Sequence, residues 1–263
     1  MARGKFICFV DGDDYLISNG LSIVFNSYTL KDNPDVTIYQ RYIIKNHFDY
    51  LAEEKIERQR GKRLFVGNGH NYILNQGLIF NVTLAFFKRS FLMENNLKFL
   101  NYTIAEDFLF FTSVLLLNPA IISTSYNIYR YIVHENSITT TRSSKQAQKC
   151  VHDYLSVMKN IQQQLSNIND KAQSIYNIYT KAMNLNSFYI YKKILIANYS
   201  TSTYTSIINE FKKAKLLPII HTGTNLKCII GYSIINILTY IPILYKPTSF
   251  IYNRILAKYI LKL

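Results

Sequence analysis

The chain has 263 residues, of which 49% are hydrophobic and 17% charged, and its formal net charge is +14. This balance excludes an intrinsically disordered chain and allows either one large domain or two small ones. The three cysteines, Cys8, Cys150 and Cys228, are scattered without metal-ligand spacing, and their odd number argues against a disulfide framework. A reducing compartment fits best, and because no signal-peptide pattern precedes the first predicted strand, we expect a cytoplasmic protein.

The positive charge is concentrated in the second half of the chain. Residues 1–144 carry a net charge of +2, whereas residues 145–263 carry 15 Lys and Arg against three acids, a net charge of +12. Because these basic residues lie among long aliphatic runs, they favour an anionic membrane surface, and no nucleic-acid partner is expected. Part of the lysine excess also fits an AT-rich genome, since Ile, Asn, Lys and Tyr are all abundant.

The first predicted element is a short strand over Phe6–Val10. Its five consecutive apolar residues predict a strand buried on both faces, as in a parallel sheet covered by helices. The strand runs into Asp11-Gly12-Asp13-Asp14, and ligands of open α/β sheets bind just beyond the carboxyl ends of strands. Three carboxylates this close repel one another unless a cation relieves them, and all-oxygen ligands favour Mg²⁺ or Mn²⁺.

Two other interpretations of this acidic turn stay open. A plain Asp-Gly turn at a strand end is common and needs no ligand. A strand followed by Asp-x-Asp also resembles the opening of the haloacid-dehalogenase-like phosphohydrolases, in which one Asp is the nucleophile and the next the acid. That family usually continues with Gly and then Thr or Val, whereas Asp14 and Tyr15 follow here.

Capping residues, helix-breaking residues and hydrophobic pattern predict a helix and a strand after the acidic turn. A helix from Ser18-Asn19, which we expect to cap it, runs to about Leu30 and ends at Asp32-Asn33-Pro34-Asp35. A β-rich run then predicts a strand over Val36–Ile44. Residues 53–63 are a run of charges, which we expect to form a solvated loop, with a lid or acceptor loop as the alternative. A strand is expected over residues 78–87 and a short helix over residues 88–96.

Two adjacent acids, Glu106 and Asp107, introduce an otherwise apolar helix that continues to Leu117. Acids at a helix N-terminus are favoured by the macrodipole, which is the structural interpretation. The functional interpretation is that a carboxylate at the mouth of an apolar helix is partly desolvated, so that its pKa rises toward the range of a general base. A strand over residues 121–133 follows, with Arg130 near its end and His134 as a candidate ligand directly after it.

Several motifs in series resemble one family. The strand into Asp-x-Asp-Asp, then "FFKRSFLMENNLKF", "AEDFLFF" and "YRYIVHENSIT", have the order and spacing of family 2 inverting glycosyltransferases. These enzymes have the GT-A fold, a mixed α/β architecture, and are common in bacterial polysaccharide clusters. The resemblance covers roughly residues 2–143. It implies transfer of a sugar from a nucleotide-sugar donor to a polysaccharide or lipid-linked acceptor.

The resemblance also implies roles for individual residues at the donor site. Asp11 and Asp13 would hold a divalent metal, Mg²⁺ or Mn²⁺, against the diphosphate of the nucleotide-sugar. His134 would complete the metal or diphosphate site. Asp14 and Arg130 would help to bind the nucleotide-sugar, with Arg130 near the phosphates.

On the acceptor side, the resemblance makes Asp107 the base that deprotonates the acceptor hydroxyl, with Glu106 beside it. The chain departs from the family at its start, because the N-terminal βαβα half that cradles the nucleotide is absent. We therefore expect either a truncated reading frame or a missing half supplied by another polypeptide. A catalytically silent remnant that binds only a membrane or a partner enzyme is the alternative.

From residue 144 the pattern becomes helical, which predicts two domains, 1–143 and 144–263. Three helices are expected near residues 144–168, 171–197 and 204–217, and none carries a catalytic motif. In the first, one face is expected to be buried: Val151, Tyr154, Leu155, Met158, Ile161, Leu165 and Ile168.

Two further segments indicate a membrane surface. The stretch from Cys228 to Tyr245 has no charge and is interrupted by Pro242. It carries a mildly polar stripe, so we expect it to lie in the interface: Tyr232, Ser233, Asn236, Thr239 and Tyr240. After Lys246-Pro247, a final helix with Arg254, Lys258 and Lys262 on one face reads as an anchor on the inner face of the cell membrane, or as an ordinary surface helix.

Overall fold

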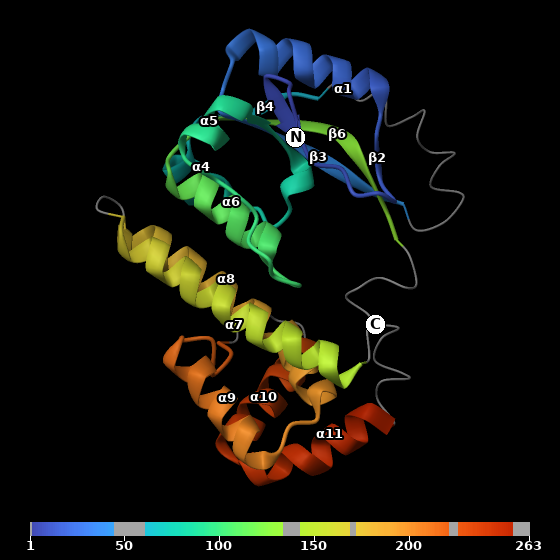
Figure 1. Cartoon of the computed structure of the whole chain (residues 1–263), viewed down its shortest axis with the longest axis vertical. Coiled ribbons are helices and arrows are strands. Elements are labelled where there is room, and N and C mark those ends of the chain that lie inside the picture. Colours follow the sequence, from blue (N-terminus) through green and yellow to red (C-terminus); the bar gives the residue numbers. More distant parts are fainter. Residues whose placement is uncertain (1, 45–60, 134–142, 169–171, 221–225, 255–263) are drawn as a thin grey trace. The chain divides into compact units, whose positions relative to one another are not determined.

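The computed structural model describes residues 2–44, 61–133, 143–168, 172–220 and 226–254 (Figure 1). Contacts divide the chain into two compact units. One combines Met1–Asn101 with Glu106–Ser137, and the other combines Tyr102–Ala105 with Ile138–Leu263. The first unit holds a sheet with helices, and the described part of the second unit is helical.

Within the described residues, the first unit contains a six-stranded mixed sheet in the order β1-β5-β3-β6-β2, with β4 also paired to β6. The pair β3 and β6 is parallel, and the other pairs are antiparallel. The strand bounds are β1 Phe6–Cys8, β2 Tyr15–Leu16, β3 Val36–Ile44, β4 Arg63–Asn68, β5 Ala85–Lys88 and β6 Ala120–Ile132.

The long strand β6 organises this sheet. It runs parallel to β3 from the pair Val36 and Ile121 to the pair Ile44 and Ile132, with register shifts near Gln40. Its first part also pairs with β4 and its last part with β2. The predicted strand over Val36–Ile44 is confirmed, and the strand predicted over 121–133 differs from β6 by one residue at each end.

The prediction of a first strand buried on both faces of a parallel sheet is wrong. β1 is three residues long, half-buried, and antiparallel to β5. The apolar run is explained by aromatic packing instead. The ring of Phe9, just beyond β1, lies edge-on to Phe87, Phe99 and Phe110 at centroid distances of 5.2–5.9 Å.

The helices of the first unit agree in part with those predicted from the sequence. The bounds are α1 Ser18–Val24, continued by the π-helical turn η1 Phe25–Leu30, α4 Gly69–Gln76, the 3₁₀ turn η2 Val82–Leu84, α5 Arg89–Glu94 and α6 Glu106–Leu116. The prediction that Ser18-Asn19 caps the first helix is wrong, because the N-cap of α1 is Ile17, and no side chain caps the helix by a hydrogen bond. The strand predicted over 78–87 begins only at Ala85, after η2.

The described part of the second unit comprises α7 Ser144–Ser166, α8 Ala172–Ala197, α9 Thr201–Lys213, α10 Leu226–Tyr240, the 3₁₀ turn η4 Pro242–Leu244 and α11 Tyr245–Arg254 (Figure 1). The predicted buried face of α7 is confirmed from Val151 to Leu165, while Ile168 is half-buried beyond its end. The last helix begins at Tyr245, one residue before Lys246-Pro247, and Lys258 and Lys262 lie outside the described residues.

A cluster of buried tyrosines joins four helices of this unit. The hydroxyl of Tyr204 on α9 lies 2.5 Å from that of Tyr191 on α8 and donates to the carbonyl of Leu238 on α10 at 3.0 Å. The ring of Tyr204 stacks on that of Tyr245 on α11 at 4.0 Å. The Tyr245 hydroxyl in turn donates to the carbonyl of Ile194 at 2.9 Å. Each buried hydroxyl is thus paired, as burial of a polar group requires.

We expect Tyr204→Phe to lower the free energy of unfolding by about 1–3 kcal/mol, because the change removes two buried hydrogen bonds and leaves polar partners unsatisfied. Urea denaturation followed by circular dichroism measures the change. Tyr189→Phe is the matched control, since Tyr189 on α8 is 68% exposed. Equal stability of the Tyr204→Phe chain and the wild type would contradict this account of the helical core.

Candidate active site

The acidic turn is fastened to β6 through Asp14. One oxygen of its carboxylate accepts a hydrogen bond from the Tyr129 hydroxyl at 2.6 Å, and the other accepts from the backbone N–H of Ile132 at 2.8 Å. The Asp11 N–H donates to the same Tyr129 hydroxyl at 3.3 Å, and the Asp14 N–H donates to the Asp11 carbonyl at 3.1 Å, which closes the turn. Asp14 therefore holds the turn in place, a role that the sequence did not indicate.

This anchoring leaves Asp11 and Asp13 exposed at the tip of the turn, while Asp14 is half-buried. Partial burial and then the charges of Asp14 and Asp13 raise the pKa of Asp11, and a hydrogen bond with Tyr129 opposes the shift. The like charges of the turn therefore act on one another, as the sequence predicted.

Asp107 lies in the first turn of α6, directly after Glu106, and both are half-buried. The pKa of Asp107 is raised to about 6, by burial first and then by the charges of Glu106 and Asp11, while a hydrogen bond with the backbone of Val82 opposes the shift. Phe9, two residues before Asp11, packs against Phe110 of α6 at a ring distance of 5.9 Å, and the charge of Asp11 contributes to the pKa shift of Asp107. The fold thus brings together two acidic motifs that are far apart in the sequence.

The two other predicted site residues have different positions. Arg130 is fully buried within β6, where its Nη1 donates to the carbonyl of Asn127 at 2.7 Å and its guanidinium lies over the ring of Tyr42 at 5.7 Å. His134 lies outside the described residues. The predicted contacts of Asp14, Arg130 and His134 with a donor phosphate or metal stay predictions.

The acidic turn suits a hard divalent cation by its donor chemistry. In the part of the chain that the structure describes, no group of three or more His, Cys, Asp or Glu side chains lies close enough together to hold a metal ion. Mg²⁺ is commonly bound by only one or two carboxylates together with water and substrate phosphates. The exposed oxygens of Asp11 and Asp13, close enough for Asp13 to raise the pKa of Asp11, fit that mode.

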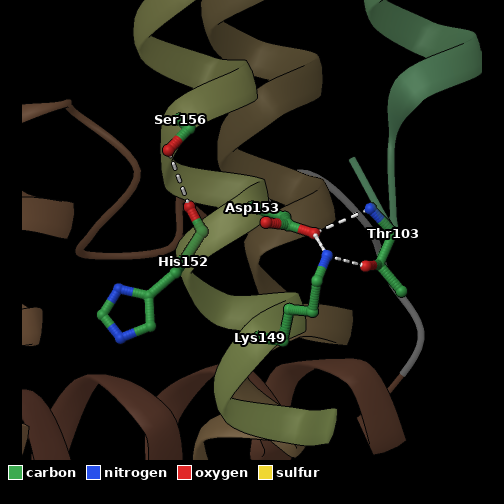
Figure 2. Close-up of polar contacts among 5 residues, drawn as sticks. All are labelled: Thr103, Lys149, His152, Asp153 and Ser156. Atoms are coloured by element: carbon green, nitrogen blue, oxygen red, sulfur yellow. Dashed lines mark hydrogen bonds and ion pairs between the residues drawn. The ribbon is translucent and has the colours of Figure 1, made fainter. Parts of the chain in front are cut away.

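A polar cluster in the second unit holds the segment that leads into α6 (Figure 2). The carboxylate of Asp153 on α7 accepts from the Thr103 N–H at 2.7 Å and from Lys149 Nζ at 2.7 Å, and Lys149 also donates to the Thr103 hydroxyl. Two residues later the backbone of Ala105 has a positive φ of 62°. The spacing of Lys149 and Asp153 is the i, i+4 signal that sequence reasoning passed over.

The comparisons with known proteins rest on structure. No protein-family model matches the chain, and no curated protein matches its sequence. Crystal structures of S. aureus TarS 1–349 are similar to it: the complex with UDP-GlcNAc at a TM-score of 0.58 and 17% identity, covering 94% of this chain and 66% of that one. The complex with UDP has a TM-score of 0.55 and 17% identity, covering 94% of this chain and 65% of that one. A third TarS 1–349 structure has a TM-score of 0.54 and 16% identity, with the same coverages of 94% and 65%.

These likenesses establish the class of fold. The chain has a mixed α/β, glycosyltransferase-like fold followed by a helical region, and the fold expected from the motifs is confirmed. The chain spans slightly less than two thirds of the length of the TarS fragments that it matches. At this level of identity the likeness concerns the fold alone.

We expect removal of the Asp153 carboxylate to loosen the Thr103 segment. In Asp153→Ala, hydrogen exchange of the Thr103 amide should become faster by about tenfold or more, because the hydrogen bond that protects it is lost. Asp153→Asn should have a smaller effect, since an accepting oxygen remains. Ser156→Ala is the matched control on the same helix, because Ser156 Oγ donates only to the His152 carbonyl one turn away, at 3.0 Å (Figure 2). Unchanged exchange at Thr103 in Asp153→Ala would contradict the anchor.

The raised pKa of Asp107 predicts a pH dependence of stability. The folded chain holds this proton more tightly than the unfolded chain, so the stability it contributes is full below the ordinary value of 3.8 and is lost as the pH rises through about 6. Asp107→Asn should therefore raise the free energy of unfolding at pH 8 by about 1–2 kcal/mol, allowing for partial solvent access.

At pH 4 the same substitution should change stability little, because the carboxyl group is then mostly protonated in the folded chain. Thermal denaturation at several pH values measures the difference. Glu94→Gln is the control, as Glu94 is an exposed acid on α5. A pH-independent effect of Asp107→Asn would show that the carboxyl group is not desolvated.

Proposed function

We propose that the chain is a glycosyltransferase that moves a sugar from a nucleotide-sugar donor to a polysaccharide or lipid-linked acceptor, with inversion at the anomeric carbon. The observation that carries the proposal is the desolvated Asp107, with a pKa raised to about 6, within electrostatic reach of the acidic turn. The likeness of the fold to TarS, which has been crystallised with UDP-GlcNAc and with UDP, supports a nucleotide-sugar as the donor.

The proposed chemistry is a single displacement. The acceptor hydroxyl loses its proton to a carboxylate oxygen of Asp107 as the acceptor oxygen attacks the anomeric carbon. The bond from that carbon to the nucleoside diphosphate breaks on the opposite face, and the electron pair leaves with the diphosphate. A base with a pKa near 6 is ionised at neutral pH yet still basic enough to accept this proton. The charge of Glu106 assists by raising that pKa.

The leaving diphosphate carries the developing negative charge. Asp11 and Asp13 would hold Mg²⁺ or Mn²⁺, whose charge would neutralise the diphosphate when the ion is bound. Asp14 would act through its anchoring hydrogen bonds, by keeping the turn on β6. We place the protein in the cytoplasm, peripheral on the inner face of the cell membrane, where lipid-linked acceptors are presented.

We expect Asp107→Asn to lower turnover about 10²–10⁴-fold, the usual contribution of a general base, while UDP binding in the presence of Mn²⁺ stays nearly intact. Asp13→Ala should instead abolish the metal-dependent part of UDP binding. Release of UDP from UDP-GlcNAc and other UDP-sugars measures turnover, and calorimetry measures binding.

Three other outcomes would contradict the proposal in different ways. Full activity of Asp107→Asn would exclude its role as the base. Loss of a phosphatase activity in Asp11→Asn alone would favour the haloacid-dehalogenase-like phosphohydrolase. Metal-dependent UDP binding by the wild-type chain without any turnover of donor would identify a catalytically silent remnant.

A further inference from the structure

The outward side of α10 is apolar, the reverse of an ordinary surface helix. Four residues of α10 and Ile241 directly after it, spaced by four, four, three and four positions, lie on one face, and we call them the isoleucine face: Leu226, Ile230, Ile234, Ile237 and Ile241. Their exposed fractions run from 45% to 67%. The opposite side of the helix is buried through Ile235 and Leu238. A helix that is apolar on both sides is expected in a deep core or in lipid.

Two polar side chains of α10, those of Asn236 and Thr239, face inward and stabilise the fold, whereas Ser233 and Tyr240 are exposed. The amide of Asn236 accepts from the Ile219 N–H at 2.8 Å and donates to the Ile219 carbonyl at 3.0 Å. Thr239 is buried, and its hydroxyl donates to the Asn236 carbonyl at 2.7 Å. These two members of the polar stripe thus satisfy hydrogen bonds within the unit, and the isoleucines are left outside, whereas the location of this segment in a membrane interface stays a prediction.

Exposed apolar residues continue along the chain past Pro242. In η4, Ile243 is 76% exposed, and on α11 Phe250 and Ile251 are also exposed. Among the described residues, no single helix is long and apolar enough to cross a membrane. Cys228–Tyr240 and Pro242–Arg254 reach the length and apolarity of a span only as a pair, and they bend by 114°.

The charge around this surface has one sign. No Asp or Glu follows Glu210 in the sequence, and Glu210 itself pairs with Lys159 at 2.7 Å. An open groove of 710 Å³ beside α11 is lined by Lys246 and Arg254 together with Phe250 and Ile251. Asn198 orients Lys246, whose Nζ lies 3.1 Å from the amide oxygen, and the Arg254 guanidinium lies 4.6 Å from the centre of the Phe250 ring. Cations beside apolar side chains match an anionic amphiphile.

We propose that the isoleucine face, with η4 and the start of α11, docks on an anionic phospholipid bilayer. The isoleucines insert at the boundary between headgroups and acyl chains, and Lys246 and Arg254 take headgroup phosphates into the groove. A second copy of the chain fits this surface poorly, since it would bring the same unbalanced positive charge against itself. The inference extends the membrane location in the proposed function, and it assigns the main contact to α10 instead of the three terminal cations.

The test is co-sedimentation of the full chain with vesicles of phosphatidylcholine alone or mixed with phosphatidylglycerol, at low and high salt. No donor or acceptor is present, so the result does not depend on transferase activity. Ile234→Gln with Ile237→Gln should weaken binding to the mixed vesicles by about tenfold or more at both salt concentrations, because apolar insertion resists screening. Lys246→Gln with Arg254→Gln should weaken binding by about tenfold at low salt only.

Each pair of substitutions has a matched control. Ile23→Gln with Met93→Gln removes two exposed apolar side chains from the first unit, and Lys145→Gln with Lys181→Gln removes two exposed cations from α7 and α8. Both controls should bind vesicles like the wild type. Circular dichroism verifies that every variant is folded, and a chain ending at Arg254 should keep most of the binding.

Several results would overturn the proposal. Equal vesicle binding of the isoleucine variant and the wild type would remove the isoleucine face from the contact. Loss of binding on deletion of residues 255–263 alone would assign the anchor to the terminal segment. A dimer in sedimentation equilibrium that the isoleucine variant converts to a monomer, without vesicle binding by the wild type, would make a second copy the occupant.

Discussion

The hydrogen bonds between Asp14 and β6 are the constraint on which the candidate site depends. A turn of three like charges has no reason of its own to stay in one conformation, because the charges repel. Asp14 accepts from both the Tyr129 hydroxyl and the Ile132 N–H, which binds the turn to β6, the strand that pairs with β3, β2 and β4. The remaining acids are thereby held in one place. Charge-assisted hydrogen bonds of this kind are stronger than neutral ones, and they suit this task.

Two acidic residues of the candidate site, Asp107 and Asp11, carry charges that do not stabilise the fold. The pKa values of Asp107 and Asp11 are both raised, by burial first and by neighbouring acids next. Ionisation of Asp107 and Asp11 lowers the stability of the folded chain at neutral pH, so these two acids destabilise the sheet unit. Acids brought together against such a cost are typical of sites that bind a cation or transfer a proton. The same clustering explains why the metal and the base are proposed in one place.

In the helical unit, by contrast, several buried polar groups are paired by hydrogen bonds that stabilise the fold. The Tyr204 hydroxyl, the Asn236 amide and the Thr239 hydroxyl each have a hydrogen-bond partner in its interior. The isoleucines of α10 are then left on the outside, beside a surface that carries cations without acids. Contiguous exposed apolar residues on a folded unit are typical of a binding surface. The bilayer contact proposed above would give this helix two different neighbours, the protein core on one side and lipid on the other.

Local pattern determined much of this protein by itself. The β-branched run of β3, the apolar helix behind Glu106 and Asp107, and the buried face of α7 all follow from local sequence, because each pattern lies within one continuous segment of the chain. The acidic motifs were also visible, since adjacent acidic residues beside apolar runs stand out in any sequence.

Tertiary structure alone decided the rest. The edge position of β1, the anchoring of Asp14 by Tyr129, and the hold of Asp153 on Thr103 each join residues at least 50 positions apart, and no local signal encodes such pairings. The inward direction of Asn236 was equally hidden, because a helix with apolar residues on both sides can present either face to the core. The neighbouring loop at Ile219 made that choice by offering Asn236 a donor and an acceptor.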